Sequence, residues 1–176
     1  MHLSAYNRMM IIGNNGSGKS VLAKELAAIT GLPLVHLDME FWKPNWEQPT
    51  KAEWAARQKE LAAAEKWIIE GNHTGTMEIR FQRADLILFL DVNRLVCLSS
   101  VLRRTRGKHM GMPAYLETKY DKAFFQLCKG LWDFPKTRKR TMLQLHEKYA
   151  ETPFLVIKGR KNINRMLKKW RKEQAR

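Results

Sequence analysis

One octapeptide near the start of the chain has the residue types and spacing needed to hold a chain of phosphates. Gly13-Asn14-Asn15-Gly16-Ser17-Gly18-Lys19-Ser20 matches G-x-x-x-x-G-K-[ST] at every fixed position. Small residues let successive backbone N–H groups turn toward phosphate oxygens, at the positive end of the following helix. We expect Lys19 to bridge the β- and γ-phosphates of ATP and the Ser20 hydroxyl to ligate Mg²⁺. The octapeptide therefore predicts an ATP and Mg²⁺ site.

Three acidic residues, Asp38, Glu70 and Asp91, each end an apolar run and are candidates for the remaining chemistry. Ligands of open parallel sheets gather at the carboxyl ends of the strands, where such residues would lie. Asp38 suits a general base or an anchor for the acceptor, and Glu70 suits a group that orders the waters of the metal. For both, a structural role at a strand end stays open. Asp91 precedes a predicted helix and is interpreted as its N-terminal cap.

Short apolar runs and helical patterns predict the framework that positions these groups. The apolar runs are continuous rather than alternating, as in strands covered by helices on both faces. Between them, apolar residues recur at helical spacing, and Thr50 with Glu53 forms a capping box for one helix. This order predicts a parallel sheet between two layers of helices. The expected strands are 8–12, 34–38, 67–70, 86–90 and 154–157, and the expected helices are 20–29, 50–65, 94–104, most of 115–149, and 162–173.

Length and composition fit a single domain spanning residues 1–176, because 44% of the residues are apolar and one core serves a chain of this size. No apolar run reaches the roughly 18–20 residues that span a bilayer, and residues 1–13 lack the pattern of a signal peptide. We therefore expect a soluble, cytoplasmic protein without a membrane partner. Cys97 and Cys128 show no C-x-x-C spacing, which argues against a disulfide framework or a zinc site.

Positive charge is concentrated in the second half of the chain. Residues 1–93 hold 10 Lys or Arg and 11 Asp or Glu, whereas residues 94–176 hold 22 and 6. A field this one-sided attracts polyanions, and electrostatics alone does not separate nucleotide phosphates from a nucleic-acid backbone. A solvated basic surface is the alternative for the C-terminal tail.

Beyond the phosphate loop, the chain resembles the DNA topology modulation protein family (FlaR-like), a branch of the adenylate-kinase-like P-loop kinases. The resemblance rests on His36-Leu37-Asp38, on the aromatic block Phe41-Trp42-Lys43-Pro44-Asn45-Trp46 and on Trp67-Ile68-Ile69-Glu70-Gly71-Asn72. It implies a P-loop NTPase fold, a three-layer α/β/α sandwich with five parallel strands and a helical lid at about 104–120. Members of the family usually carry Asp at position 70 and Tyr at position 73, where this chain has Glu and His.

The same resemblance implies that arginines close over the transferred phosphoryl group. Guanidinium groups suit this role because they stay charged and grip phosphate through paired hydrogen bonds. Each arginine could instead be a surface charge. Arg160, after the last strand, falls where similar kinases hold the adenine base. The lid candidates are Arg103, Arg104 and Arg106, followed by Arg138 and Arg140 in the next helix.

The aromatic residues Phe41, Trp42 and Trp46 follow the proposed acceptor-side acid, Asp38. They either stack on a planar substrate or belong to the core, and the sequence does not decide between these. His36 and His73 are interpreted as structural.

Three functions fit these patterns. The first is a kinase that transfers the γ-phosphoryl group of ATP to a nucleotide or another small molecule. The second is a nucleic-acid-binding protein that uses ATP as a switch, and the third is an inactive nucleotide sensor. The chain contains no N-K-x-D pattern of the kind that reads guanine, and specificity for the acceptor depends on a pocket shape that the sequence does not reveal.

Overall fold

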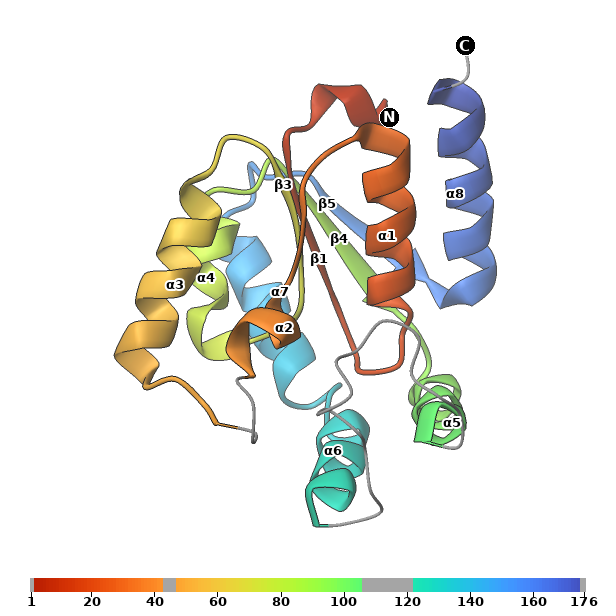
Figure 1. Cartoon of the computed structure of the whole chain (residues 1–176). Coiled ribbons are helices and arrows are strands. Elements are labelled where there is room, and N and C mark those ends of the chain that lie inside the picture. The colour runs from red at the N-terminus through yellow and green to blue at the C-terminus, as the bar shows by residue number, and fades with distance from the viewer. Residues whose placement is uncertain (1, 43–46, 106–121, 175–176) are drawn as a thin grey trace.

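The computed structural model describes residues 2–42, 47–105 and 122–174 (Figure 1). Residues 106–121, which include Arg106 and most of the expected lid, lie outside the described residues, as does Trp46. Within the described part of the chain, no helix has both the length and the apolar character needed to cross a membrane.

A five-stranded, all-parallel sheet forms the centre of the fold, as predicted. Its spatial order is β2-β3-β1-β4-β5. Because β1 lies between β3 and β4, the loop that leaves β1 emerges beside the ends of both neighbours. The strands are β1 (Arg8–Gly13), β2 (Leu34–His36), β3 (Trp67–Glu70), β4 (Leu86–Asp91) and β5 (Phe154–Lys158).

Helices cover both faces of the sheet, so the predicted three-layer sandwich is confirmed (Figure 1). One layer contains α1 (Lys19–Thr30) and α8 (Gly159–Gln174), and the other contains α3 (Lys51–Ala63), α4 (Met77–Phe81) and α7 (Arg138–Lys148). The remaining helices lie toward the end of the sheet where β1 leads into the glycine-rich loop. They are α2 (Leu37–Phe41), α5 (Arg94–Thr105) and α6 (Lys122–Trp132), and two 3-10 turns cover Leu3–Ala5 and Thr74–Thr76.

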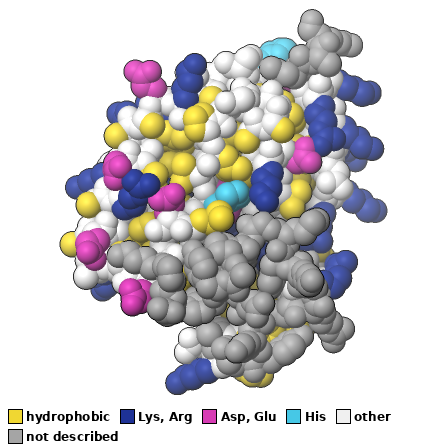
Figure 2. All heavy atoms as spheres, in the orientation of Figure 1, with side chains coloured by type: hydrophobic (Ala, Val, Ile, Leu, Met, Phe, Trp, Pro, Cys, Tyr) yellow, Lys and Arg dark blue, Asp and Glu magenta, His cyan; other side chains and the backbone are white. Residues whose placement is uncertain are grey.

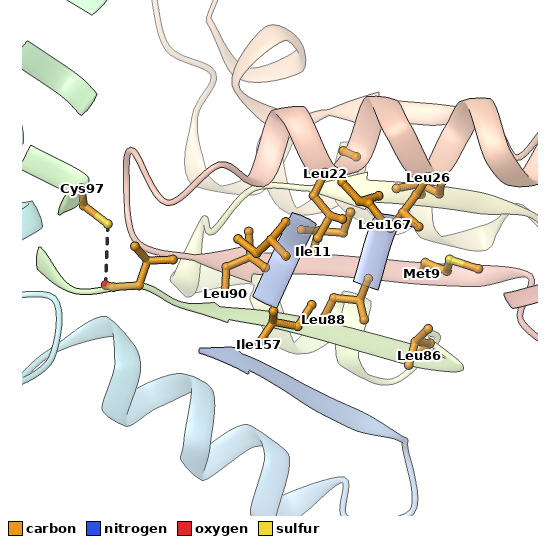
Figure 3. Packing of buried hydrophobic residues seen from close by; sticks show 14 of the residues in the cluster. Met9, Ile11, Leu22, Leu26, Leu86, Leu88, Leu90, Cys97, Ile157 and Leu167 are labelled. Atoms are coloured by element: carbon orange, nitrogen blue, oxygen red, sulfur yellow. Dashed lines mark hydrogen bonds between the residues drawn. The ribbon is translucent and has the colours of Figure 1, made fainter. Parts of the chain in front are cut away.

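Alternate residues of β1 build the two halves of the core. Ile11 packs toward Leu22 of α1 and Leu167 of α8 (Figure 3), whereas Met10 belongs to the cluster under α3, α4 and α7 that includes Phe81. All of these side chains except Leu167 are fully buried, and Leu167 is nearly so. Burial on both faces explains why the strands read as continuous apolar runs.

Several boundaries differ from the sequence expectation. The helical pattern expected over most of 115–149 forms two helices, α6 and α7, and two other differences move candidate site residues into helices. The second strand was expected to run to Asp38, but β2 ends at His36, which pairs with the last residue of β3, Glu70. Without a strand partner beyond that point, the chain turns into α2, and Asp38 lies in its first turn. The closing helix begins at Gly159 rather than at residue 162.

The prediction that Asp91 caps the next helix is wrong. Its two carboxylate oxygens accept hydrogen bonds from Lys139 Nζ of α7, at 3.0 and 2.9 Å. The capping contact comes from Asn93, whose Oδ1 accepts from the backbone N–H of Leu95 at 2.8 Å. A polar residue nearer to the helix start is better placed for this contact, which leaves Asp91 to tie β4 to α7.

Candidate active site

The glycine-rich loop is walled on two sides, and two of its glycines, Gly13 and Gly16, leave no room for side chains. A Cβ at Gly13, which has φ 149°, would lie 2.7 Å from the carbonyl oxygen of Leu90 in β4. A Cβ at Gly16, with φ 77°, would collide with the carbonyl of Cys97 in α5. Both positions therefore require glycine, since positive φ and a backbone wall exclude a side chain. The loop leads directly into the N-terminus of α1, as an anion site of this type requires.

Side chains of the loop add polar groups to the candidate phosphate site. Lys19 is the first residue of α1, and its Nζ donates to the Asn14 carbonyl at 3.2 Å, so its charge lies across the loop. Asn14 is anchored in turn to the Leu131 carbonyl of α6, at 3.0 Å from its Nδ2. The Ser17 hydroxyl is fully buried and has no hydrogen-bond partner among the described residues. A cation and an unpaired buried hydroxyl in one loop are suited to receive an oxyanion.

Asn72 fastens the start of this loop to the segment after β3. Its Oδ1 accepts from the Gly13 N–H at 3.2 Å, and its Nδ2 donates to the Gly13 carbonyl at 2.8 Å. The fully buried Arg80 donates to the Gly71 carbonyl at 2.8 Å and also to the Asn72 carbonyl. Burial lowers the pKa of Arg80 to about 9, although Glu70 acts in the opposite direction, so the guanidinium is charged at neutral pH. Asn72 belongs to a block that carried the family resemblance, but the sequence assigned no role to Asn72 or Arg80, because both act through backbone groups that no sequence pattern pairs with them.

Glu70 contacts Ser20, the other residue that is predicted to bind the metal. Its Oε1 accepts from the Ser20 hydroxyl at 3.0 Å and lies 3.0 Å from His36 Nδ1. Its other oxygen, Oε2, is buried and lacks a hydrogen-bond partner among the described residues. A hydroxyl beside an unpaired carboxylate oxygen, at the edge of a phosphate loop, fits the oxygen ligands that Mg²⁺ and its waters take. Ser20 and Glu70 could therefore hold the metal.

Asp38, the candidate acid for the acceptor side, is held by His73. His73 Nε2 lies 3.1 Å from Asp38 Oδ1, while 54% of the Asp38 side chain stays exposed. Burial among neighbouring atoms raises the pKa of Asp38, but the hydrogen bond from His73 and the electrostatic interactions with His73, Lys19 and His36 outweigh it. The pKa is therefore lowered, and Asp38 is ionised at neutral pH.

Both histidines thus contact candidate catalytic acids rather than serving the fold alone. His36 contacts Glu70, and His73 contacts Asp38. In the sequence, His36 lies two residues before Asp38, and His73 lies three residues after Glu70. The sequence contained no sign that each histidine would contact the acid of the other segment. The crossing follows from the neighbouring positions of β2 and β3 in the sheet.

Of the predicted arginines that the structure describes, Arg104 and Arg160 interact with residues of this candidate site. Burial lowers the pKa of Arg104, at the end of α5, while the charges of Glu70 and Asp38 raise it, which places Arg104 in the field of both acids. Arg160 donates to the Gly16 carbonyl at 2.8 Å and contacts the Ser100 hydroxyl, so it braces the phosphate loop against α5.

The other arginine candidates make their described contacts elsewhere. Arg103 donates from Nε to the Ser99 carbonyl of its own helix at 3.4 Å. Arg138, at the start of α7, lies beside Gly130 of α6. Arg140 is exposed on α7. Their part in phosphate binding stays a prediction.

The structure shows the surroundings of Phe41 in the aromatic segment. Phe41 is partly buried and packs against the hydrophobic core: its ring centroid lies 4.9 Å from that of Trp54, edge to face, and 4.8 Å from that of His73. Trp42 is half-buried and meets Phe41 at 5.0 Å. Phe41 therefore packs against the core, whereas stacking of Trp42 on a substrate stays a prediction.

Comparison with known proteins shows the class of fold. No family model and no curated protein matches the chain. Among solved structures, a shikimate kinase from Acinetobacter baumannii in complex with shikimate is similar, with a TM-score of 0.60 and 14% identity over 95% of this chain and 92% of that chain. A gluconokinase from Sinorhizobium meliloti 1021 gives 0.56 and 16%, over 99% and 94%. A shikimate kinase from Bacteroides thetaiotaomicron gives 0.54 and 18%, over 97% and 99%.

The fold is thus that of the shikimate-kinase-like P-loop NTPases, with its five-stranded parallel sheet. It resembles ATP-dependent small-molecule kinases at low sequence identity. The resemblance to the DNA topology modulation proteins stays a prediction.

Proposed function

We propose that this protein is an ATP-dependent phosphotransferase that moves the γ-phosphoryl group to a hydroxyl of a small molecule or nucleotide. One observation carries the proposal. The phosphate loop, the Ser20–Glu70 pair and the ionised Asp38 lie together where β1, β2 and β3 end. These parts are what a kinase needs: a cradle for the triphosphate, ligands for Mg²⁺ and a carboxylate on the acceptor side.

In this proposal, the backbone N–H groups of residues 13–20 and the Lys19 ammonium bind the triphosphate. Ser20 and Glu70 hold Mg²⁺, which supplies positive charge to the phosphate oxygens. Asp38 accepts the proton of the acceptor hydroxyl as that oxygen forms its bond to the γ-phosphorus. The bond from the γ-phosphorus to the bridging oxygen breaks, and its electron pair leaves with ADP. Arg104 and Arg160 offset negative charge around the loop.

The test is ADP release from Mg·ATP in the presence of nucleosides, nucleoside monophosphates, sugars and sugar acids. An acceptor that stimulates ADP release identifies the substrate class. Asp38→Asn should bind Mg·ATP like the parent protein but transfer at least about 100-fold more slowly, because a positioned base contributes roughly that much. The matched control is Glu40→Gln on the same helix, which removes an acid paired with Arg57 and should leave the rate unchanged.

Two results would contradict the proposal. A protein that binds Mg·ATP but releases no ADP with any acceptor would be a nucleotide sensor. An unchanged rate in Asp38→Asn would show that Asp38 is not the base.

The basic face of α8 supports a second candidate, ATP-switched binding of nucleic acid. Residues 159–174 carry seven Lys or Arg and one Glu, a net charge of +6. Figure 2 shows Lys and Arg side chains gathered along the edge of the molecule where α8 lies in Figure 1. The exposed members are Lys161, Arg165, Lys168, Lys169, Arg171 and Lys172. This candidate agrees with the predicted resemblance to DNA topology modulation proteins.

Fluorescence anisotropy with a labelled DNA duplex, measured over a range of salt with ATP or ADP, tests this candidate. Affinity should fall steeply with salt and differ between the two nucleotides, since phosphate contacts release counterions. Lys168→Glu combined with Lys172→Glu should weaken binding. Absence of binding near physiological salt removes the candidate.

A further inference from the structure

We propose that His73 is the positioning residue for Asp38: it binds one carboxylate oxygen and leaves the other to take the proton of the acceptor hydroxyl. The inference rests on the proposed function, because it assigns a task within the same phosphoryl transfer. It goes beyond that function by naming a residue that touches neither ATP nor the hydroxyl and acts through Asp38.

The backbone of His73 is the first observation. His73 has φ 38° and ψ 61°, and it is the one residue other than glycine with a positive φ among residues 2–42, 47–105 and 122–174. The left-handed region is costly for a residue with a side chain and persists where the surroundings enforce it. The surroundings here are identifiable. The Asn72 carboxamide is clamped to Gly13, and the Asn72 carbonyl accepts from the buried Arg80, so the residue before His73 cannot relax.

The imidazole ring is the second observation. Its centroid lies 4.8 Å from those of Phe41 and of Trp54, and 17% of the side chain is exposed. The packed rings set the orientation of the imidazole, so that Nε2 faces Asp38 Oδ1 at 3.1 Å. An ionised carboxylate can only accept, so Nε2 carries the hydrogen of this bond. Phe41 and Asp38 share the short helix α2, which ties the ring and the acid to one element.

Asp38 is left with one oxygen for chemistry. Oδ1 is engaged by His73, and no described residue hydrogen-bonds Oδ2. During transfer, the proton of the acceptor hydroxyl passes to Oδ2 as the oxygen–phosphorus bond forms and the electron pair of the broken bond leaves with ADP. A fixed Oδ1 keeps Oδ2 from rotating out of line, which matters because small misplacements slow transfer strongly.

Because of the charges and the hydrogen bond around Asp38, loss of His73 should change the pH at which the Asp38 carboxyl titrates. The groups that face its carboxylate are Lys19 of α1, His36 of β2, Arg104 of α5 and His73 itself. Burial raises the pKa of Asp38, and the hydrogen bond from His73 is the largest of the effects that lower it. Removing that bond should therefore raise the pKa. Because transfer needs ionised Asp38, activity would then fail at a higher pH as the solution is acidified.

The test is an NMR titration of the full-length protein labelled with ¹³C at the aspartate carboxyl carbons, with Asp38→Asn used to assign the signal. His73→Phe keeps an aromatic ring but no donor, and His73→Asn suits a left-handed backbone but is too short to reach. In both variants, the Asp38 midpoint should rise by about one pH unit. His73→Gln, which restores an N–H donor, should bring the midpoint back toward the parent value.

The matched control is His146→Phe, another half-buried histidine, which stacks on Phe154 at 4.2 Å in α7. It should leave the Asp38 midpoint unchanged. An unchanged midpoint in both His73→Phe and His73→Asn, with each variant folded by circular dichroism, overturns the inference. If an acceptor is turned over, the acid limb of kcat/KM must rise with the midpoint, and an acid limb that does not move also overturns it.

A different measurement shows whether the proposed kinase function itself fails. A parent protein that takes up no Mg·ATP in calorimetry removes the kinase assignment, whereas the carboxyl titration requires no nucleotide.

Discussion

The phosphate loop is built from consecutive residues, whereas the acid pairs beside it, Ser20–Glu70, His36–Glu70 and Asp38–His73, join residues far apart in the sequence. The loop consists of eight consecutive residues, and its proposed role in phosphate binding depends mostly on backbone N–H groups and on one lysine. The acid pairs join side chains far apart in the chain. Ser20 and Glu70 are 50 residues apart, His36 and Glu70 are 34 apart, and Asp38 and His73 are 35 apart. The proposed phosphate site is therefore local in the sequence, whereas the proposed chemistry at the acceptor depends on which strands lie side by side.

Arg80→Leu should have the largest effect on stability. It tests how strongly Gly71 and Asn72, which lie between Glu70 and His73, depend on the hydrogen bonds from Arg80. It leaves the buried carbonyls of Gly71 and Asn72 without their donor, which should cost about 3 kcal/mol in free energy of unfolding. Urea unfolding measures this cost. The control is Arg83→Leu, an exposed neighbour with two contacts of 3.4 Å, expected to lose less than about 1 kcal/mol. Equal losses would mean that burial of Arg80 is not what holds this segment.

Lys19→Ala tests the phosphate loop, the region that is built from consecutive residues. Loss of its charge from the phosphates should weaken Mg·ATP binding by about 100-fold, or about 2.7 kcal/mol, with little change in stability. Calorimetry with Mg²⁺ present measures the affinity. Lys24→Ala, an exposed lysine of the same helix, is the control and should bind ATP normally. Normal binding by Lys19→Ala would remove the assigned role of the loop.

Asn72→Ala measures the connection between the two regions. It removes both hydrogen bonds to Gly13 and should cost about 2 kcal/mol of stability. ATP affinity should also fall several-fold, because the loop would lose its anchor. Asn162→Ala removes one side-chain bond to the Lys158 carbonyl, outside the loop, and should not change ATP affinity. Unchanged ATP binding in Asn72→Ala would show that the two regions are independent.

Thr50→Ala should give the smallest effect and separates fold stability from site chemistry. It breaks the capping box of α3, in which the Glu53 N–H donates to Thr50 Oγ1 at 3.2 Å, at a cost of about 1 kcal/mol. Thermal unfolding detects the loss, and ATP affinity should match that of the parent. A change in ATP affinity would indicate that α3 influences the phosphate loop.

Much of the fold could be predicted because its signals are local. The five strands are apolar runs, and the loop and the Thr50–Glu53 capping box are short patterns that were found where they were expected. The site could be predicted only in part. Asp38 and Glu70 were both expected at strand ends; Glu70 is the last residue of β3, whereas Asp38 belongs to α2, and Asp91 is paired with Lys139. In each case, a distant partner decided the local structure.

The sequence by itself determined where the glycine-rich loop forms between β1 and α1, because its glycines and its lysine lie within eight consecutive residues. Only the tertiary structure decided which side chains surround this loop. The order β2-β3-β1 crosses the two histidines onto the two acids and sets Asn72 on Gly13. Such pairings have no pattern along the chain, because hydrogen bonds between neighbouring strands depend on register in space and not on separation in sequence.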